Sequence, residues 1–121
     1  MSYGDASEAC KTEEAMLAMP KTEELDVALI NLVRTEGHNL KYWIGMRDNK
    51  RLRLHKRQWL WEDGSKLGKY KGWNPGKPDN NRRAHWKKLC VLYRSGTTTH
   101  PMWDEQECKN NHRFICQVQV E

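Results

Sequence analysis

The sequence lacks any long apolar run. No stretch of its 121 residues approaches the roughly 18 apolar residues of a membrane-spanning helix, so we expect no membrane insertion by this chain. A disordered chain is not expected either, because six tryptophans, four tyrosines and four cysteines are too many large or buried residue types for one. The length predicts a single domain over residues 1–121 with one modest core.

The sequence also lacks the common catalytic motifs. It contains no nucleophile elbow, P-loop, His-Glu-x-x-His motif or dinucleotide fingerprint. Asp104 and Glu105 are adjacent and are not expected to face each other as an acid/base pair. We therefore predict a binding protein and no enzyme. No groove-entering motif accompanies the basic charge, so nucleic acid is not the expected partner.

The four cysteines, Cys10, Cys90, Cys108 and Cys116, contain no Cys-x-x-Cys pair. An even set without metal-binding spacing predicts two disulfides and an oxidising, extracellular compartment. Three pairings are possible, and the spacing does not choose among them. The alternative is four reduced, buried thiols in a cytosolic protein. Residues 1–9 do not resemble a signal peptide, so either a signal was removed and a methionine added, which is the interpretation we prefer, or the protein is not secreted.

Charge is unevenly distributed along the chain. Residues 1–36 hold three basic and eight acidic side chains, a net charge of −5, whereas the whole chain has +5. Residues 37–121 therefore carry +10. A basic half attracts anionic partners of several kinds, although a solvated basic surface without a partner fits equally well.

The first 37 residues predict two helices. The first begins at the Ser2-Tyr3-Gly4-Asp5 capping box and ends at Pro20. The second begins near Thr22 and ends at Gly37. Apolar residues recur along it at helical spacing and predict its buried face: Leu25, Ala28, Leu29, Leu32 and Val33.

After Gly37 the pattern changes to short strands, which we predict at residues 42–46, 58–61, 89–93, from Met102, and at 113–120. Residues 64–88 are rich in glycine, proline, asparagine and lysine and predict a long, functional loop. The order of two helices followed by strands predicts an α+β fold with short antiparallel sheets.

Several segments, in this order, resemble the C-type lectin-like domain family. They are Ser2-Tyr3-Gly4-Asp5-Ala6 with Cys10, Trp43-Ile44-Gly45-Met46, Trp59 to Gly64, Trp73-Asn74-Pro75-Gly76-Lys77-Pro78-Asp79-Asn80, Cys90-Val91, Trp103-Asp104 with Cys108, and Phe114-Ile115-Cys116. The resemblance covers nearly the whole chain and implies disulfides between Cys10 and Cys116 and between Cys90 and Cys108. The strand that usually precedes the first helix has no counterpart, so we expect it to be absent or truncated. An unpaired last strand would then favour a homodimer.

In calcium-dependent members of this family, the ion sits in the long loop. The family's Glu-Pro-Asn motif is Lys77-Pro78-Asp79 here, Lys88 stands where a glutamate precedes the loop cysteine, and Asp104-Glu105 replaces Asn-Asp. Calcium needs six to eight oxygen ligands, and lysine has no acceptor. We expect the lysines to pair with these acids, so the calcium site is predicted to be lost and no cofactor is expected. Zinc is left open, because His85 and His100 lie near acids without a recognised zinc spacing.

Two basic clusters are candidate binding elements, at residues 47–57 and 82–88. Guanidinium groups suit sulfate, phosphate and carboxylate. We predict calcium-independent recognition of a protein ligand or an anionic, microbial glycan, as a secreted protein or receptor ectodomain in innate recognition. The candidate ligand residues are Asn74, Lys77, Asp79, Asn80, Asn81, Arg82, Arg83, His85, Trp86, Lys88, Asp104 and Glu105.

Two other functions fit the sequence. The first is a structural protein of the extracellular matrix or of a biomineral, which uses its basic surface as an adhesive. Such a protein would bind diffusely and with a steep dependence on salt, whereas a receptor-like module would have one saturable site. The second is a conventional calcium-dependent sugar-binding lectin.

Overall fold

The computed structural model describes residues 1–36, 41–48, 58–78, 88–95 and 101–118. Within these residues the helices and strands alternate only near the N-terminus, and the remaining chain forms strands and connections. The elements are α1 (Tyr3–Thr12), β1 (Met16–Leu17), α2 (Glu23–Glu36), β2 (Tyr42–Asp48), β3 (Trp59–Trp61), β4 (Leu89–Ser95), β5 (Pro101–Glu107), β6 (Arg113–Phe114) and β7 (Cys116–Gln117). No helix in these ranges is both long and apolar enough to cross a membrane.

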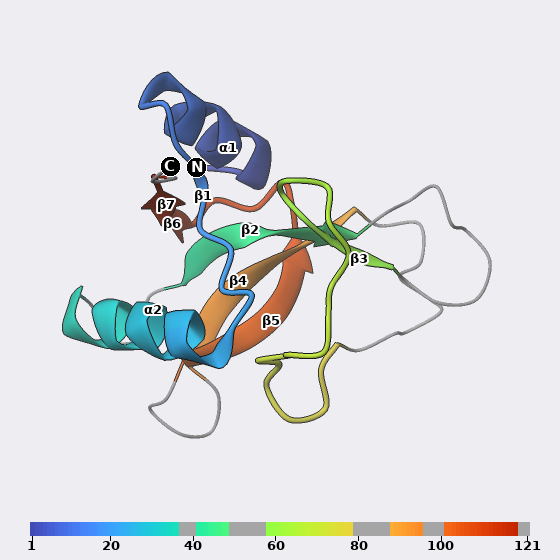
Figure 1. Cartoon of the computed structure of the whole chain (residues 1–121). Coiled ribbons are helices and arrows are strands. Elements are labelled where there is room, and N and C mark those ends of the chain that lie inside the picture. The colour runs from blue at the N-terminus through green and yellow to red at the C-terminus, as the bar shows by residue number, and fades with distance from the viewer. Residues whose placement is uncertain (37–40, 49–57, 79–87, 96–100, 119–121) are drawn as a thin grey trace.

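The strands form two sheets, which confirms the α+β prediction. The larger sheet has the order β3-β2-β4-β5 with antiparallel neighbours, and β6 pairs in parallel with β2. The smaller sheet pairs β1 with β7. Figure 1 shows α2 beside β4 and β5, and α1 near β1 and β7.

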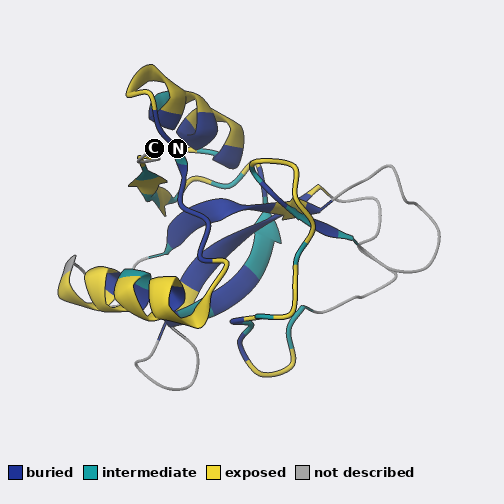
Figure 2. Ribbon diagram, in the orientation of Figure 1, coloured by how far each residue is buried: buried dark blue, intermediate teal, exposed yellow. Residues whose placement is uncertain are grey.

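The central strands β2 and β4 are buried on both faces over residues 42–46 and 89–93, which Figure 2 draws in dark blue, whereas Arg47 and Arg94 further along are exposed. On one face, Ile44 of β2 packs in a core that includes Ile30 and Val33 of α2. On the other face, Trp43 packs in a second core with Tyr3 and residues of α1. Because successive strand residues point to opposite faces, a strand between two helices must be apolar at every position. This explains the unbroken apolar runs at 42–46 and 89–93.

The first helix begins where the capping box predicts and ends earlier than predicted. Ser2 is the N-cap, and its hydroxyl accepts a hydrogen bond from the Asp5 amide at 3.3 Å. The prediction that the helix continues to Pro20 is wrong, because α1 ends at Thr12. Glu14 then adopts a left-handed conformation with φ of 56°, a common way to terminate a helix.

The residues after this turn form a strand that the local sequence pattern does not predict. Met16 pairs with Gln117 and Leu17 pairs with Cys116, which gives the last strand, β7, an antiparallel neighbour. The single strand predicted at 113–120 is divided at Ile115 into β6 and β7, and residues 119–121 lie outside the described ranges.

The second helix has the predicted bounds, and its buried face matches the predicted stripe only in part. Val33 of the stripe is in the core and Leu29 packs against it, whereas Leu25 and Leu32 are 36% and 46% exposed. Ile30, which lies outside the stripe, is also in the core. The buried face includes the charged residue Asp26, which is only 2% exposed. Side chains on neighbouring elements donate hydrogen bonds to the Asp26 carboxylate. These bonds orient α2 with Asp26 in the core, which is a rotation away from the orientation that the apolar stripe predicts.

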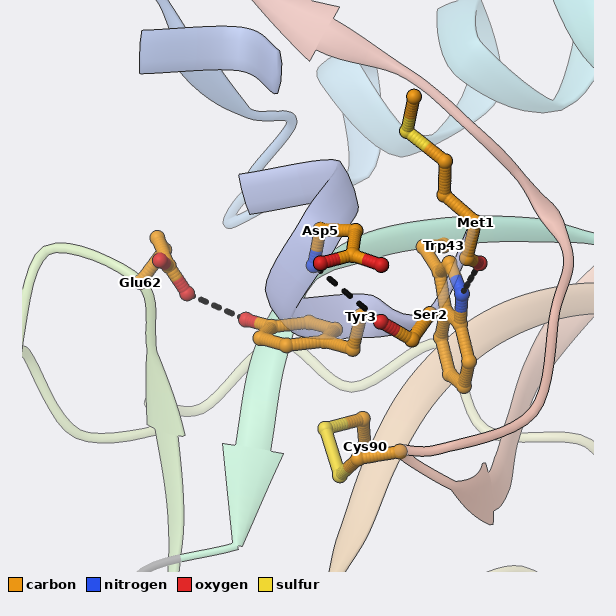
Figure 3. The surroundings of a disulfide bond; sticks show 8 residues. Met1, Ser2, Tyr3, Asp5, Trp43, Glu62 and Cys90 are labelled. Atoms are coloured by element: carbon orange, nitrogen blue, oxygen red, sulfur yellow. Dashed lines mark hydrogen bonds between the residues drawn. A yellow bond between two sulfur atoms is a disulfide. The ribbon is translucent and has the colours of Figure 1, made fainter. Parts of the chain in front are cut away.

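Both disulfides implied by the resemblance are confirmed. Cys10 of α1 bonds to Cys116 of β7, and Cys90 of β4 bonds to Cys108 just after β5. Figure 3 shows how Tyr3, near one of these bridges, points its hydroxyl at Glu62. The same Glu62 carboxylate accepts the Ser7 hydroxyl at 2.6 Å, so α1 is hydrogen-bonded to the turn after β3.

Gly45, in the middle of β2, is the one position of this strand without space for a side chain. A Cβ atom there would lie 2.8 Å from the backbone oxygen of Leu17 and 3.1 Å from the Glu62 Cβ. The Gly45 amide donates to Ala18 O and its carbonyl accepts from the Glu62 amide, both at 2.7 Å. Gly45→Ala should therefore lower the free energy of unfolding by about 1–3 kcal/mol, the usual cost of overpacking.

Chemical denaturation measures this loss, with Gly68→Ala as the matched control, because nothing lies within 4 Å of a Cβ at Gly68. Equal stability of the two variants would contradict the close approach of three chain segments at Gly45.

Candidate functional site

The candidate site centres on Asp104 in β5, a carboxylate that is 3% exposed. One side-chain oxygen, Oδ2, lies 3.1 Å from an Arg94 guanidinium nitrogen. The other, Oδ1, lies 3.7 Å from the Lys77 ammonium and also accepts the Glu105 amide at 2.8 Å. Two cations and one buried anion make a cluster with an excess of positive charge.

Lys77 reaches Asp104 from a tight turn in the long loop. The Lys77 amide donates to Asn74 O at 2.9 Å, which closes a four-residue turn with Pro75 and Gly76 at its centre. Gly76 has a φ of 82°, as the third residue of a type II turn requires. The sequence Asn-Pro-Gly-Lys therefore folds locally so that its lysine, followed by a cis bond to Pro78, points to β5.

Asn74 anchors this turn on the sheet. Its side-chain amide donates to Arg94 O at 3.2 Å and to Met102 O at 3.4 Å, and its backbone amide donates to Trp103 O at 2.9 Å. Asn74 is buried, so its described contacts place it beneath the surface as a support for Lys77.

Arg94 belongs to this site although sequence reasoning does not select it. Leu92 faces Asp104 across the β4–β5 ladder, and Met102 faces Arg94. Since alternate residues share a face, Arg94 and Asp104 are diagonal neighbours on one face of the sheet. The strand register, once predicted, would have been enough to find this pair.

The other predicted ligand residues fall into two groups. Lys88 is exposed just before β4, and Glu105 is half-buried next to Asp104 with its side chain on the opposite face of β5. The remaining candidates lie outside the described residues: Asp79, Asn80, Asn81, Arg82, Arg83, His85 and Trp86. The same is true of residues 49–57 in the first basic cluster.

The described loop extends the positive charge of the site. Residues 64–78 contain four lysines and no acidic residue. Lys66, Lys69 and Lys71 are all exposed. Within the described ranges these three lysines form no ion pair, so their charges are open to solvent.

The described residues do not fit a divalent cation at Asp104. Both carboxylate oxygens already face cationic groups, and a calcium ion there would meet the charges of Lys77 and Arg94 at close range. Across the parts of the chain that the structure describes, no three His, Cys, Asp or Glu side chains gather as a metal site.

The family model for the lectin C-type domain matches residues 1–118. Perlucin from Haliotis laevigata is 29% identical over 116 residues, which are 96% of this chain and 69% of perlucin. The chain spans only 33% of a longer relative, collectin-43 from Bos taurus, at 26% identity.

Solved structures agree with this match. TC14, a C-type lectin from the tunicate Polyandrocarpa misakiensis, superposes with a TM-score of 0.78 at 27% identity, over 100% of this chain and 92% of TC14. SPL-2, described as a Ca²⁺-independent C-type lectin from Saxidomus purpuratus, has a TM-score of 0.76 at 25% identity, over 95% of this chain and 76% of SPL-2. The family match over nearly the entire sequence, the fold and both disulfides together show that the chain belongs to the C-type lectin domain family.

Proposed function

We propose that this domain is a calcium-independent lectin-like binding module for anionic ligands, in particular sulfated or carboxylated glycans. The observation that carries the proposal is the cluster at Asp104, where Lys77 and Arg94 occupy both oxygens of the carboxylate. Each cation remains about a third to a half exposed at its side chain, 32% for Lys77 and 48% for Arg94. Each therefore presents unused donors to solvent.

The chemistry of these two side chains supports an anionic ligand. A guanidinium offers five donors in a planar fork and an ammonium offers three. Asp104 accepts only some of them, so a sulfate or carboxylate oxygen can be bound between the same two cations by charge-assisted hydrogen bonds. The open lysines of residues 64–78 would extend such contacts along a polymeric ligand.

Three other features of the proposal follow from the family and the disulfides. A family of binding domains supports a protein that is not an enzyme. Two disulfides support an extracellular site of action, as a secreted protein or an ectodomain in innate recognition. The Ca²⁺-independent description of SPL-2 shows that the fold is used without calcium in a similar protein. A single domain over 1–121 stays a prediction. Self-association also stays a prediction, which sedimentation tests, although the pairing of β7 with β1 removes the unpaired last strand that suggested it.

The test measures binding of dextran sulfate in EDTA, with uncharged dextran as the reference ligand. The variant is the triple change Lys77→Gln, Arg94→Gln and Asp104→Asn, which removes the charges without leaving a buried carboxylate unpaired. We expect an affinity loss of about tenfold or more, as for the loss of charged hydrogen bonds. The control is Arg113→Gln at an exposed position, which lowers the net charge by the same single unit.

Three outcomes would count against the proposal. Equal loss in the triple variant and the control would mean that only net charge matters. Diffuse, steeply salt-dependent binding that survives the triple change would support the structural adhesive instead. Binding that appears only after calcium is added would restore a conventional lectin.

A further inference from the structure

Asp26 is a buried carboxylate on α2 that accepts hydrogen bonds from three other parts of the chain. Its Oδ1 accepts the Trp103 indole nitrogen at 3.0 Å and the Tyr93 hydroxyl, and its Oδ2 accepts the Tyr70 hydroxyl at 2.5 Å. In the described part of the chain no cation pairs with it. Burying an unpaired carboxylate is costly, and these three charge-assisted hydrogen bonds offset that cost.

Both tyrosines keep the protons that they donate. Burial, with the charge of Asp26 and the hydrogen bond to it, raises the pKa of Tyr93 well above its ordinary value. Burial and the hydrogen bond to Asp26 also raise the pKa of Tyr70. The three hydrogen bonds therefore persist over the whole neutral range.

The donors on β4 and β5 are sequence neighbours of two residues of the Asp104 cluster. Tyr93 precedes Arg94, and Trp103 precedes Asp104. Successive strand residues point to opposite faces of a sheet. Asp26 therefore accepts hydrogen bonds from side chains on one face, while the side chains of Arg94 and Asp104 lie on the other face. The Asp26 carboxylate therefore links β4 and β5 at the residues that directly precede Arg94 and Asp104 in sequence.

Tyr70 brings the long loop to the same carboxylate. Two residues later, Gly72 packs so closely that a Cβ there would lie 2.5 Å from Asp26 Oδ2 and 2.8 Å from the Trp103 indole. The Trp103 amide donates to Gly72 O, and Asn74 then donates back to Trp103 O, each at 2.9 Å. The loop thus runs along β5 like an added strand, with a parallel bridge between Trp73 and Trp103.

We propose that Asp26 is the positioning residue of the ligand-binding face: through Tyr70 it fixes residues 70–74 on β5 and so places Lys77 beside Asp104. Asp26 touches no ligand in this role, which rests on the proposed function of the face. The short turn from Asn74 to Lys77 transmits the position, since Asn74 is held by three hydrogen bonds to the sheet.

The test compares Tyr70→Phe with Tyr93→Phe, two variants that each remove one hydroxyl from Asp26. Only Tyr70 lies in the loop, whereas Tyr93 lies in the central strand β4. The first readout is amide hydrogen exchange at Asn74 and Lys77, which needs no ligand. We expect Tyr70→Phe to speed exchange at these two amides by about tenfold, and Tyr93→Phe to change it by less than about twofold.

The second readout is the affinity for dextran sulfate, which we expect to fall severalfold in Tyr70→Phe with a smaller change in Tyr93→Phe. Unchanged exchange at Asn74 and Lys77 in Tyr70→Phe would overturn the positioning role. An equal rise in both variants would mean that Asp26 acts only on global stability. If exchange rises as expected but the wild type binds no polyanion, the proposed ligand fails and the positioning of the loop stands.

Discussion

Replacing Cys10 and Cys116 together by alanine should lower the free energy of unfolding by about 4–5 kcal/mol. This disulfide spans 106 residues, and cross-linking distant residues restricts the unfolded chain most. It also ties α1 to the last strand, so its loss releases the helix whose Tyr3 and Ser7 hold Glu62. Urea denaturation monitored by tryptophan fluorescence measures the effect.

The matched control is the pair Cys90→Ala and Cys108→Ala, whose bridge closes 18 residues. The shorter loop predicts a smaller loss, about 3 kcal/mol. A larger loss for the short loop would show that strain or packing around Cys90 outweighs chain entropy. Both proteins need to be compared with the oxidised wild type at the same pH.

Asp26→Ala should lower the free energy of unfolding by about 3–5 kcal/mol, because it leaves three buried or half-buried donors without their acceptor. Each unsatisfied donor costs about 1–3 kcal/mol, and relaxation of the structure around the new alanine relieves part of the total. Two of the donors, the Tyr93 hydroxyl and the Trp103 indole, lie in the core. Thermal and urea unfolding both measure the loss.

Asp26→Asn is the graded control, since an amide keeps one acceptor oxygen and replaces the other by a donor that faces Tyr70. Its loss should lie between those of the wild type and the alanine variant. Glu23→Ala, an exposed acid in the first turn of α2, controls for the helix dipole and should cost less than about 1 kcal/mol. A nearly neutral Asp26→Ala would show that the hydrogen bonds only balance the burial of the charge.

The helices show which parts of the fold the sequence can predict. The bounds of α2 follow from Thr22, whose side chain accepts the Leu25 amide at 3.3 Å, and from the acids of the first turn. The rotation of α2 about its axis could not be predicted from its apolar stripe, because the spacing of apolar residues contains no information about hydrogen-bond donors elsewhere in the chain. Asp26 faces the core because two tyrosines and a tryptophan distant in sequence meet it there.

The end of α1 was missed for a related reason. Met16 and Leu17 continue the apolar spacing of the helix, so a local pattern extends it to Pro20. The pairing of these residues with Gln117 and Cys116 competes for the same backbone groups, and it depends on a strand about 100 residues away. Local periodicity contains no information about that strand.

The candidate site was predicted in outline. The expectation that lysines approach the acids of the loop agrees with the contact of Lys77 with Asp104 at 3.7 Å. Lys88 forms no ion pair within the described residues, and Arg94 takes a place at Asp104 that no motif indicated. Motif positions identify the face, while the strand register decides which side chain outside the motif reaches it.

The position of the N-terminus has a consequence for how the module can be displayed. Met1 and His112 exchange backbone hydrogen bonds at 2.9 and 3.0 Å, and Figure 1 shows the N label near β7. A tether that precedes Met1 would therefore start beside β6, which pairs with β2, and two strands away from Asp104 on β5. Copies anchored on one surface would engage a repeating polyanion simultaneously, and such multivalent attachment strengthens binding by about 10²–10⁴-fold without any new contact.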